Sequence, residues 1–98
     1  MSRQVRDIPS EHRYVLTDGA EELGYVLYEV LDPGPPEVRS LRHTVVEPAH
    51  RGEGVGGVLA AGVVDLVRDA GIRVVVKCEH FESWLTKHPE AHDVVVER

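Results

Sequence analysis

Near its middle the chain reads Arg51-Gly52-Glu53-Gly54-Val55-Gly56-Gly57. This stretch follows a run rich in β-branched residues and opens a pattern of apolar residues with helical spacing. A glycine turn that leads from a strand into a helix lets backbone N–H groups approach a ligand closely, and the helix N-terminus adds partial positive charge. Arg51 contributes a full charge and a guanidinium group that can grip phosphate oxygens. The stretch therefore predicts a binding site for a phosphate or pyrophosphate group.

Three known glycine motifs compete for these residues. The P-loop motif fails because no Gly-Lys-Ser/Thr ends the turn. The dinucleotide motif G-x-G-x-x-G is met by Gly52, Gly54 and Gly57, but that motif follows the first strand of a repeated βαβ unit, and here several strand-like segments come first. The third motif, Arg/Gln-x-x-Gly-x-Gly/Ala, is met by Arg51, Gly54 and Gly56. It resembles the pyrophosphate loop of the GNAT N-acetyltransferase superfamily, which binds acetyl-CoA.

The resemblance covers nearly the whole chain, from about Val15 to Val95. The motifs that carry it are, in chain order, His43-Thr44, Glu47-Pro48, Arg51-Gly52, Cys78 and Trp84-Leu85 followed by His88-Pro89. Together they look like one branch of the superfamily, which consists of short acetyltransferase-like proteins with a single domain. The resemblance therefore implies one such domain over residues 1–98.

The spacing of apolar residues indicates the secondary structure on either side of the turn. Predicted strands cover residues 14–17, 23–31, 38–46, 72–76 and, at the edge, 94–96, and predicted helices cover residues 55–70 and 80–88. Gly71 suits the left-handed position that ends the first helix, and Pro89 stops the second. Residues 1–9 are polar, lack a usable period and are predicted to fray.

Two features predict how the helix and sheet pack. The strand over residues 23–31 is apolar on both sides, which predicts a sheet that is covered, at least in part, on both faces. Gly62 in the middle of a helix costs about 1 kcal/mol relative to Ala, and it therefore indicates close packing against a strand. The order β-β-β-α-β-α predicts an α+β fold, a GNAT-like mixed β-sheet with helices packed on it and without the N-terminal helices that shape the acceptor pocket of full GNAT domains.

The resemblance also implies where the cofactor binds. The strand that ends near Val46 and the strand that ends near Lys77 should part at their C-terminal ends. The pantetheine arm of acetyl-CoA would lie in this gap, with the pyrophosphate on the glycine turn. The residues expected to bind the cofactor are Val45, Val46, Arg51, Gly52, Glu53, Gly54, Val55, Gly56 and Gly57.

Transfer of the acetyl group to an amine needs a base for the ammonium proton and a donor for the charge that develops on the thioester oxygen. His43 is the candidate base, because an unperturbed histidine pKa near ~6.5 suits proton transfer at neutral pH. We expect it on the same sheet face as Leu41 and Val45; relatives in the superfamily often carry a glutamate at the position of Val45. Cys78 is the second catalytic candidate, expected beside the thioester sulfur, with direct transfer in a ternary complex rather than an acetyl-enzyme. His50 is interpreted as a solvated loop residue that could contact phosphate.

Composition narrows the remaining functions. Eleven basic and 17 acidic residues give a net charge of −6, which argues against a general nucleic-acid binder. The single cysteine cannot form an internal disulfide, and neither a signal peptide nor an apolar run of about 20 residues is present, so we expect a cytoplasmic protein without a membrane partner. No metal-binding spacing such as H-E-x-x-H or C-x-x-C occurs. We expect a monomer or weak homodimer whose partner is a small-molecule or protein amine.

Two alternatives stay open. A non-catalytic module that binds CoA or an acyl-CoA would use the same turn, and the missing acceptor helices and Val45 favour it. A nucleotide-binding regulatory domain would instead use Gly52, Gly54 and Gly57, and it would prefer NAD or ATP to CoA.

Overall fold

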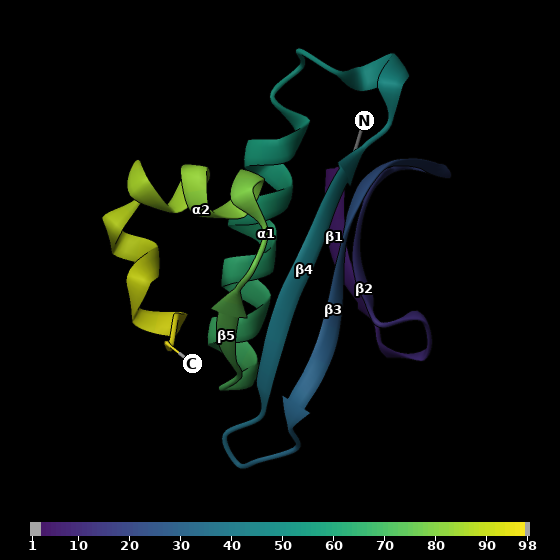
Figure 1. Cartoon of the computed structure of the whole chain (residues 1–98). Helices are drawn as coiled ribbons and strands as arrows, with labels where there is room; N and C mark the ends of the chain where they lie inside the picture. Colours follow the sequence, from purple (N-terminus) through teal and green to yellow (C-terminus); the bar gives the residue numbers. More distant parts are fainter. Residues whose placement is uncertain (1–2, 98) are drawn as a thin grey trace.

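The computed structural model describes residues 3–97 and contains one five-stranded sheet in the order β1-β2-β3-β4-β5 (Figure 1). The strands are β1 (Arg3–Ile8), β2 (Arg13–Asp18), β3 (Glu21–Asp32), β4 (Val38–Val46) and β5 (Arg73–Val76). Neighbours from β1 to β4 run antiparallel, whereas β5 pairs with β4 in parallel. The sheet is therefore mixed, and the α+β prediction is confirmed.

Two α-helices pack on the sheet, α1 (Val55–Ala70) and α2 (Glu79–Thr86). Three short 3-10 helices join the elements, η1 (Pro9–Glu11), η2 (Pro48–His50) and η3 (Pro89–Val94). The predicted first helix is confirmed to the residue at its end, where Gly71 takes a left-handed φ of 70° that costs little without a side chain. Of the helices described, α1 is the longest with 16 residues, and none is both long and apolar enough to cross a membrane.

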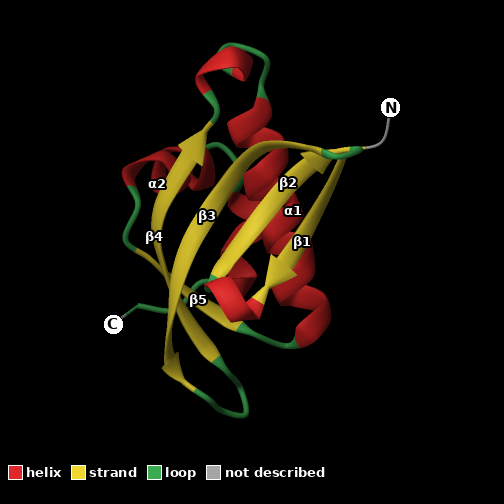
Figure 2. Cartoon of the chain, turned by 90° about the vertical axis from the view of Figure 1, so that its right-hand side faces the viewer, coloured by secondary structure: helices red, strands yellow, loops and turns green. Residues whose placement is uncertain are grey.

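Both α-helices lie on the same face of the sheet, as Figure 2 shows, and their buried side chains form one core with those of the strands. On the other face Tyr25 and Leu27 of β3 are only half-buried. Val15, which lies opposite Tyr25, and Val75 of β5 are buried on this face, with exposed fractions of 4% and 3%. The prediction of a sheet covered at least in part on both faces is therefore confirmed for the described residues. The register of β2 and β3 shifts at Leu23, which makes this residue a bulge and lets it join the core beside Val26.

The N-terminal residues form a strand, so the prediction that they fray is wrong for residues 3–8. Strand β1 pairs with all of β2, with Val5 opposite Leu16. Val5 also packs against α1, because a Cβ built on Gly62 would lie 2.3 Å from its Cγ2 atom. The close approach of a strand to Gly62 is thus confirmed. Residues 1 and 2 lie outside the described residues.

A buried arginine ties β1 to β4. The guanidinium group of Arg39 donates hydrogen bonds to Asp7 at 2.7 Å and to the hydroxyl of Tyr14 at 2.8 Å, and it lies 4.4 Å from the ring centroid of Tyr28. Burial raises the pKa of Tyr14 to about 12. Because Arg39 is only 7% exposed, this network satisfies a buried charge and fixes the first strand against the fourth.

The C-terminal segment differs in detail from the prediction. Val94 belongs to η3 rather than to a strand, and the sheet gains only an isolated parallel bridge between Val74 and Val95. The N–H group of Val96 donates to the carbonyl of Val74 at 2.9 Å. Helix α2 ends two residues earlier than predicted, at Thr86, because the residue before Pro89 avoids the helical conformation.

Candidate functional site

The parallel strands β4 and β5 part at their C-terminal ends. Their pairing runs from Val38 to Leu41, and the last hydrogen bond joins the N–H group of Lys77 to the carbonyl of Leu41 at 2.9 Å. Beyond it β4 continues to Val46, while the chain after Lys77 turns away into α2. The last five residues of β4 therefore have no β5 partner among the described residues, which leaves backbone groups at that edge able to bind amides.

A β-bulge in β4 decides where His43 points. The register with β3 places His43 opposite Leu27 and Leu41 opposite Tyr28, so Arg42 is the extra residue. Leu41 therefore faces the helices, whereas His43 faces the open side of the sheet. The expectation that these two share a face is wrong, because the bulge breaks the strict alternation on which it was based. The expectation that His43 and Val45 share a face is confirmed by the register.

Cys78 lies on the helical side of the same gap. It is 8% exposed, precedes the first residue of α2, and its thiol donates to the hydroxyl of Thr44 at 3.2 Å. Thr44 is opposite Val26 of β3, which is fully buried in the core. His43 and Cys78 are thus on opposite faces of β4, and the structure does not bring their side chains together on one side.

The glycine turn joins the end of β4 to α1 at the top of Figure 1. Gly52 and Gly54 have φ values of 85° and 76°, conformations that favour glycine, and open space lies where a side chain would be. In residues 3–97, no backbone carbonyl accepts from the N–H groups of Val55, Gly56 or Gly57, as expected for the first turn of a helix. These groups are available to an anion.

The turn borders a cavity of about 430 Å³. Its walls come from the end of β4, the turn, the start of α1 and the start of α2, and its lining residues are Thr44, Val46, His50, Arg51, Gly52, Gly54, Val55, Gly56, Gly57 and His80. Seven of the nine residues predicted to bind a cofactor are therefore gathered around one cavity. The two others, Val45 and Glu53, do not line it.

His80 is a member of this cavity that the sequence reasoning missed. Its imidazole lies against the backbone of α1, because a Cβ built on Gly56 would lie 2.3 Å from His80 Nε2. The close approach of this ring is therefore a second reason why position 56 requires glycine.

The sequence did contain a pattern that indicates His80 as a site residue, since His80 follows Cys78 by two residues at the start of a helix. Both helices begin at the C-terminal ends of parallel strands, which is where α/β sheets gather ligand-binding groups.

His50 is not simply solvated. Its Nε2 atom lies 2.9 Å from a carboxylate oxygen of Glu21, and its Nδ1 atom lies 3.0 Å from one of Glu53. The Glu53 carboxylate also lies 3.7 Å from the guanidinium group of Arg3. Hydrogen bonds to Glu21 and to Glu53 raise the pKa of His50 above its ordinary value. The Glu53 side chain is thus used to fasten the turn to the sheet.

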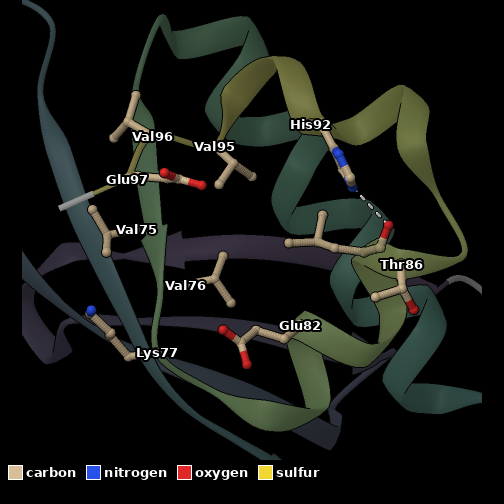
Figure 3. A pocket seen from close by; sticks show the side chains of 10 residues that line it. Val75, Val76, Lys77, Glu82, Thr86, His92, Val95, Val96 and Glu97 are labelled. Carbon is tan, nitrogen blue, oxygen red and sulfur yellow. Dashed lines mark hydrogen bonds between the residues drawn. The ribbon is translucent and has the colours of Figure 1, made fainter.

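Two further cavities differ from this one in chemistry. One of about 810 Å³ lies at the outer edge of β5 between α2 and the C-terminal segment, where Figure 3 shows Lys77, Glu82 and Glu97 around an apolar floor. It contains no residue of the glycine turn, so its greater size does not make it the better anion site. The other, of about 550 Å³, adjoins the turn and includes Trp84 and His88, whose rings stack at 4.0 Å.

A mixed sheet whose parallel strands part beside a glycine turn defines the acyltransferase fold of the GNAT type, and comparison with known proteins agrees. Residues 13–94 match the family model of GCN5-related N-acetyltransferases, so the chain belongs to this family. No curated protein matched the chain.

Three solved structures of N-acetyltransferases or putative N-acetyltransferases share the fold. A GCN5-like putative N-acetyltransferase from Staphylococcus aureus has a TM-score of 0.68 at 22% identity, and the match covers 97% of this chain and 89% of that one. Ribosomal-protein-alanine N-acetyltransferase from Brucella melitensis biovar Abortus 2308 has a TM-score of 0.60 at 17% identity over 78% of this chain and 59% of that one. A putative phosphinothricin N-acetyltransferase has a TM-score of 0.58 at 20% identity over 78% and 50%.

Proposed function

We propose that this protein is an acetyl-CoA-dependent N-acetyltransferase that transfers an acetyl group directly to an amine in a ternary complex. The observation that carries the proposal is the start of α1, where three N–H groups without a backbone partner in the described residues border a cavity beside the parting strands. A helix N-terminus with free N–H groups suits the pyrophosphate of CoA. When bound, acetyl-CoA supplies the acetyl group as an activated thioester.

The residues around the turn would divide the work of holding the cofactor. The N–H groups of Val55, Gly56 and Gly57 would donate to the pyrophosphate, and the exposed Arg51 would add a charge-assisted contact. Gly52 and Gly54 give the turn its left-handed conformations, and the Glu53 side chain stabilises the turn through its contact with His50. The stacked aromatic rings of the adjoining cavity would lie toward the adenosine end.

The unpaired edge of β4 would hold the pantetheine arm. The backbone groups of Val46 lie on the part of β4 beyond the last β5 pair and face the open edge, where an amide of the arm can replace the missing strand, whereas the carbonyl of Val45 points to Gly24 of β3. A backbone N–H group at this edge can also stabilise charge on the thioester oxygen. Val46 would therefore contribute through its backbone, whereas Val45, whose carbonyl points to β3 and whose side chain faces away from the cavity, would support the position of Val46.

The two catalytic candidates would act from opposite sides of the gap. His43 is exposed on the open face, where an amine can reach it, and it would remove the ammonium proton before attack on the thioester carbon. Cys78 is buried with its thiol bonded to Thr44, which favours a neighbour of the sulfur over a nucleophile. The amine would approach from the open face of the sheet, and the cofactor would lie along the edge of β4. These separate approaches support direct transfer.

A ligand comparison tests the proposal. CoA or acetyl-CoA at 100 times its Kd should stabilise the fold by about 2.7 kcal/mol, which is on the order of 10 °C in Tm for a domain of this size, and NAD and ATP should not. Release of free CoA in the presence of an amine library separates an enzyme from a module that only binds CoA. An unchanged Tm at millimolar CoA would refute the proposal. The antiparallel order of β1 to β4 already disfavours a dinucleotide domain, which is built from repeated βαβ units.

A further inference from the structure

The glycine turn is fastened to the sheet through one imidazole. His50 ends the short helix η2, and its ring bridges Glu21 at the start of β3 and Glu53 in the turn. Glu53 in turn faces Arg3 of β1. We call this group of four residues the turn clasp. Arg51 and Gly52 lie between His50 and Glu53 in the sequence, so the clasp spans the segment that leads to the N-terminus of α1.

The chemistry of the clasp requires a particular protonation state. An ionised carboxylate only accepts hydrogen bonds, and both ring nitrogens of His50 face one. Both nitrogens must therefore carry a proton, which makes the ring an imidazolium. A neutral imidazole has one N–H group and can satisfy only one of the two glutamates, so loss of the proton breaks one arm of the clasp.

We propose that His50 is a positioning residue, which in its doubly protonated form holds the turn in the conformation that binds the cofactor pyrophosphate. The inference rests on the proposed function. It makes cofactor affinity depend on pH, because protonation of His50 controls its contact with Glu53. His50 does not act on the reacting atoms. The charged groups facing the ring are Glu21 from β3 and Glu53 from the turn, with Arg3 of β1 behind Glu53.

The direction of the pH effect follows from the two carboxylates. They raise the pKa of His50 in the folded protein above its ordinary value, chiefly through the hydrogen bond to Glu21 and then through that to Glu53. The clasp is therefore complete below the ordinary histidine pKa, and it is lost as the pH rises through the raised value. Affinity for the cofactor should fall over the same interval.

The closing experiment measures the Kd of CoA by calorimetry from pH 6 to pH 9 for the wild type, His50→Gln and His92→Gln. We expect the wild-type affinity to fall by about tenfold with rising pH, the scale of one hydrogen bond to a charged group. His50→Gln should bind weakly at low pH and lack this fall. His92→Gln is the matched control, because His92 contacts the carbonyl of Leu85 far from the turn, and its profile should follow the wild type.

Glu21→Ala distinguishes positioning from direct contact between His50 and phosphate. At pH 6 the positioning role predicts weaker CoA binding, because one arm of the clasp is gone. Direct contact predicts equal or tighter binding, because a negative charge near the phosphate has been removed, and that result would overturn the inference.

An NMR titration of the His50 ring protons without cofactor separates failure of the inference from failure of the proposed function. Glu21→Gln should lower the pKa of His50, whether or not CoA binds. An equal pKa in both proteins would overturn the clasp. Suppose that Glu21→Gln lowers the pKa of His50 but CoA binds at no pH. This result would overturn the proposed function, and the clasp would still be supported. Parallel CoA profiles for the wild type and His50→Gln would overturn the inference while the proposed function stands.

Discussion

The substitution Gly62→Ala measures how tightly β1 packs against α1. A Cβ at this position would lie 2.3 Å from Val5 Cγ2 and 2.7 Å from Val5 Cβ. Carbon atoms pack at about 3.5–4.0 Å, so β1 would have to move by about 1 Å. Such overpacking costs about 1–3 kcal/mol, whereas alanine in a helix gains about 1 kcal/mol over glycine. We expect a net loss of about 1 kcal/mol in the free energy of unfolding, which lowers Tm by about 4–8 °C.

Gly57→Ala is the matched control for this measurement, in the same helix. Its Cβ would lie 3.8 Å from Trp84 Nε1, an ordinary contact, so the variant should gain up to about 1 kcal/mol. Thermal and urea unfolding of both variants, followed by circular dichroism, give the comparison. In a Val5→Ala background the cost of Gly62→Ala should shrink, because the Cγ2 atom is gone. If Gly62→Ala stabilises the protein as much as Gly57→Ala does, β1 does not pack against the helix and the reasoning is refuted.

Three predictions concern the proposed reaction. Gly54→Val should abolish CoA binding in calorimetry while the protein stays folded, because a branched side chain cannot adopt the left-handed turn without strain; unchanged binding would place the phosphate elsewhere. His43→Ala should lower turnover about 10²–10⁴-fold with little change in CoA affinity, and full activity would exclude it as the base. Cys78→Ser should keep most activity, and mass spectrometry after mixing the wild type with acetyl-CoA should find no acetyl group on Cys78; an adduct that an amine discharges would contradict direct transfer.

The sequence predicted the elements whose apolar residues recur with a clear period. Helix α1 was correct because one side of it is buried in the core, and strand β4 was correct although its first four residues are buried on both faces. Strand β1 was missed because it is a polar edge strand, and Val5 and Asp7 are only half-buried. Its contacts with α1 and with Arg39 join residues distant in the sequence, which a local pattern cannot reveal.

The candidate site was predicted unevenly for a related reason. The glycine turn lies in one continuous stretch, so its residues could be identified together. The side of β4 on which His43 lies depends on a bulge at Arg42, and alternation of residue types carries no sign of it. The contacts of His50 with Glu21 and of His80 with Gly56 bring together segments 29 and 24 residues apart, so only the folded chain shows them.

The strand order has a consequence for folding kinetics. Within residues 3–97, β1 to β4 each pair with the strand that is next in the sequence, and only the β4–β5 pair is separated by an α-helix. Hairpin contacts close short loops, whereas docking β5 must first close the longer loop through α1. We therefore expect the antiparallel strands to assemble first and the gap between β4 and β5 to form last. A ligand that needs this gap should slow unfolding without speeding folding, and stopped-flow measurements in urea with CoA would contradict this order if the folding rate rose instead.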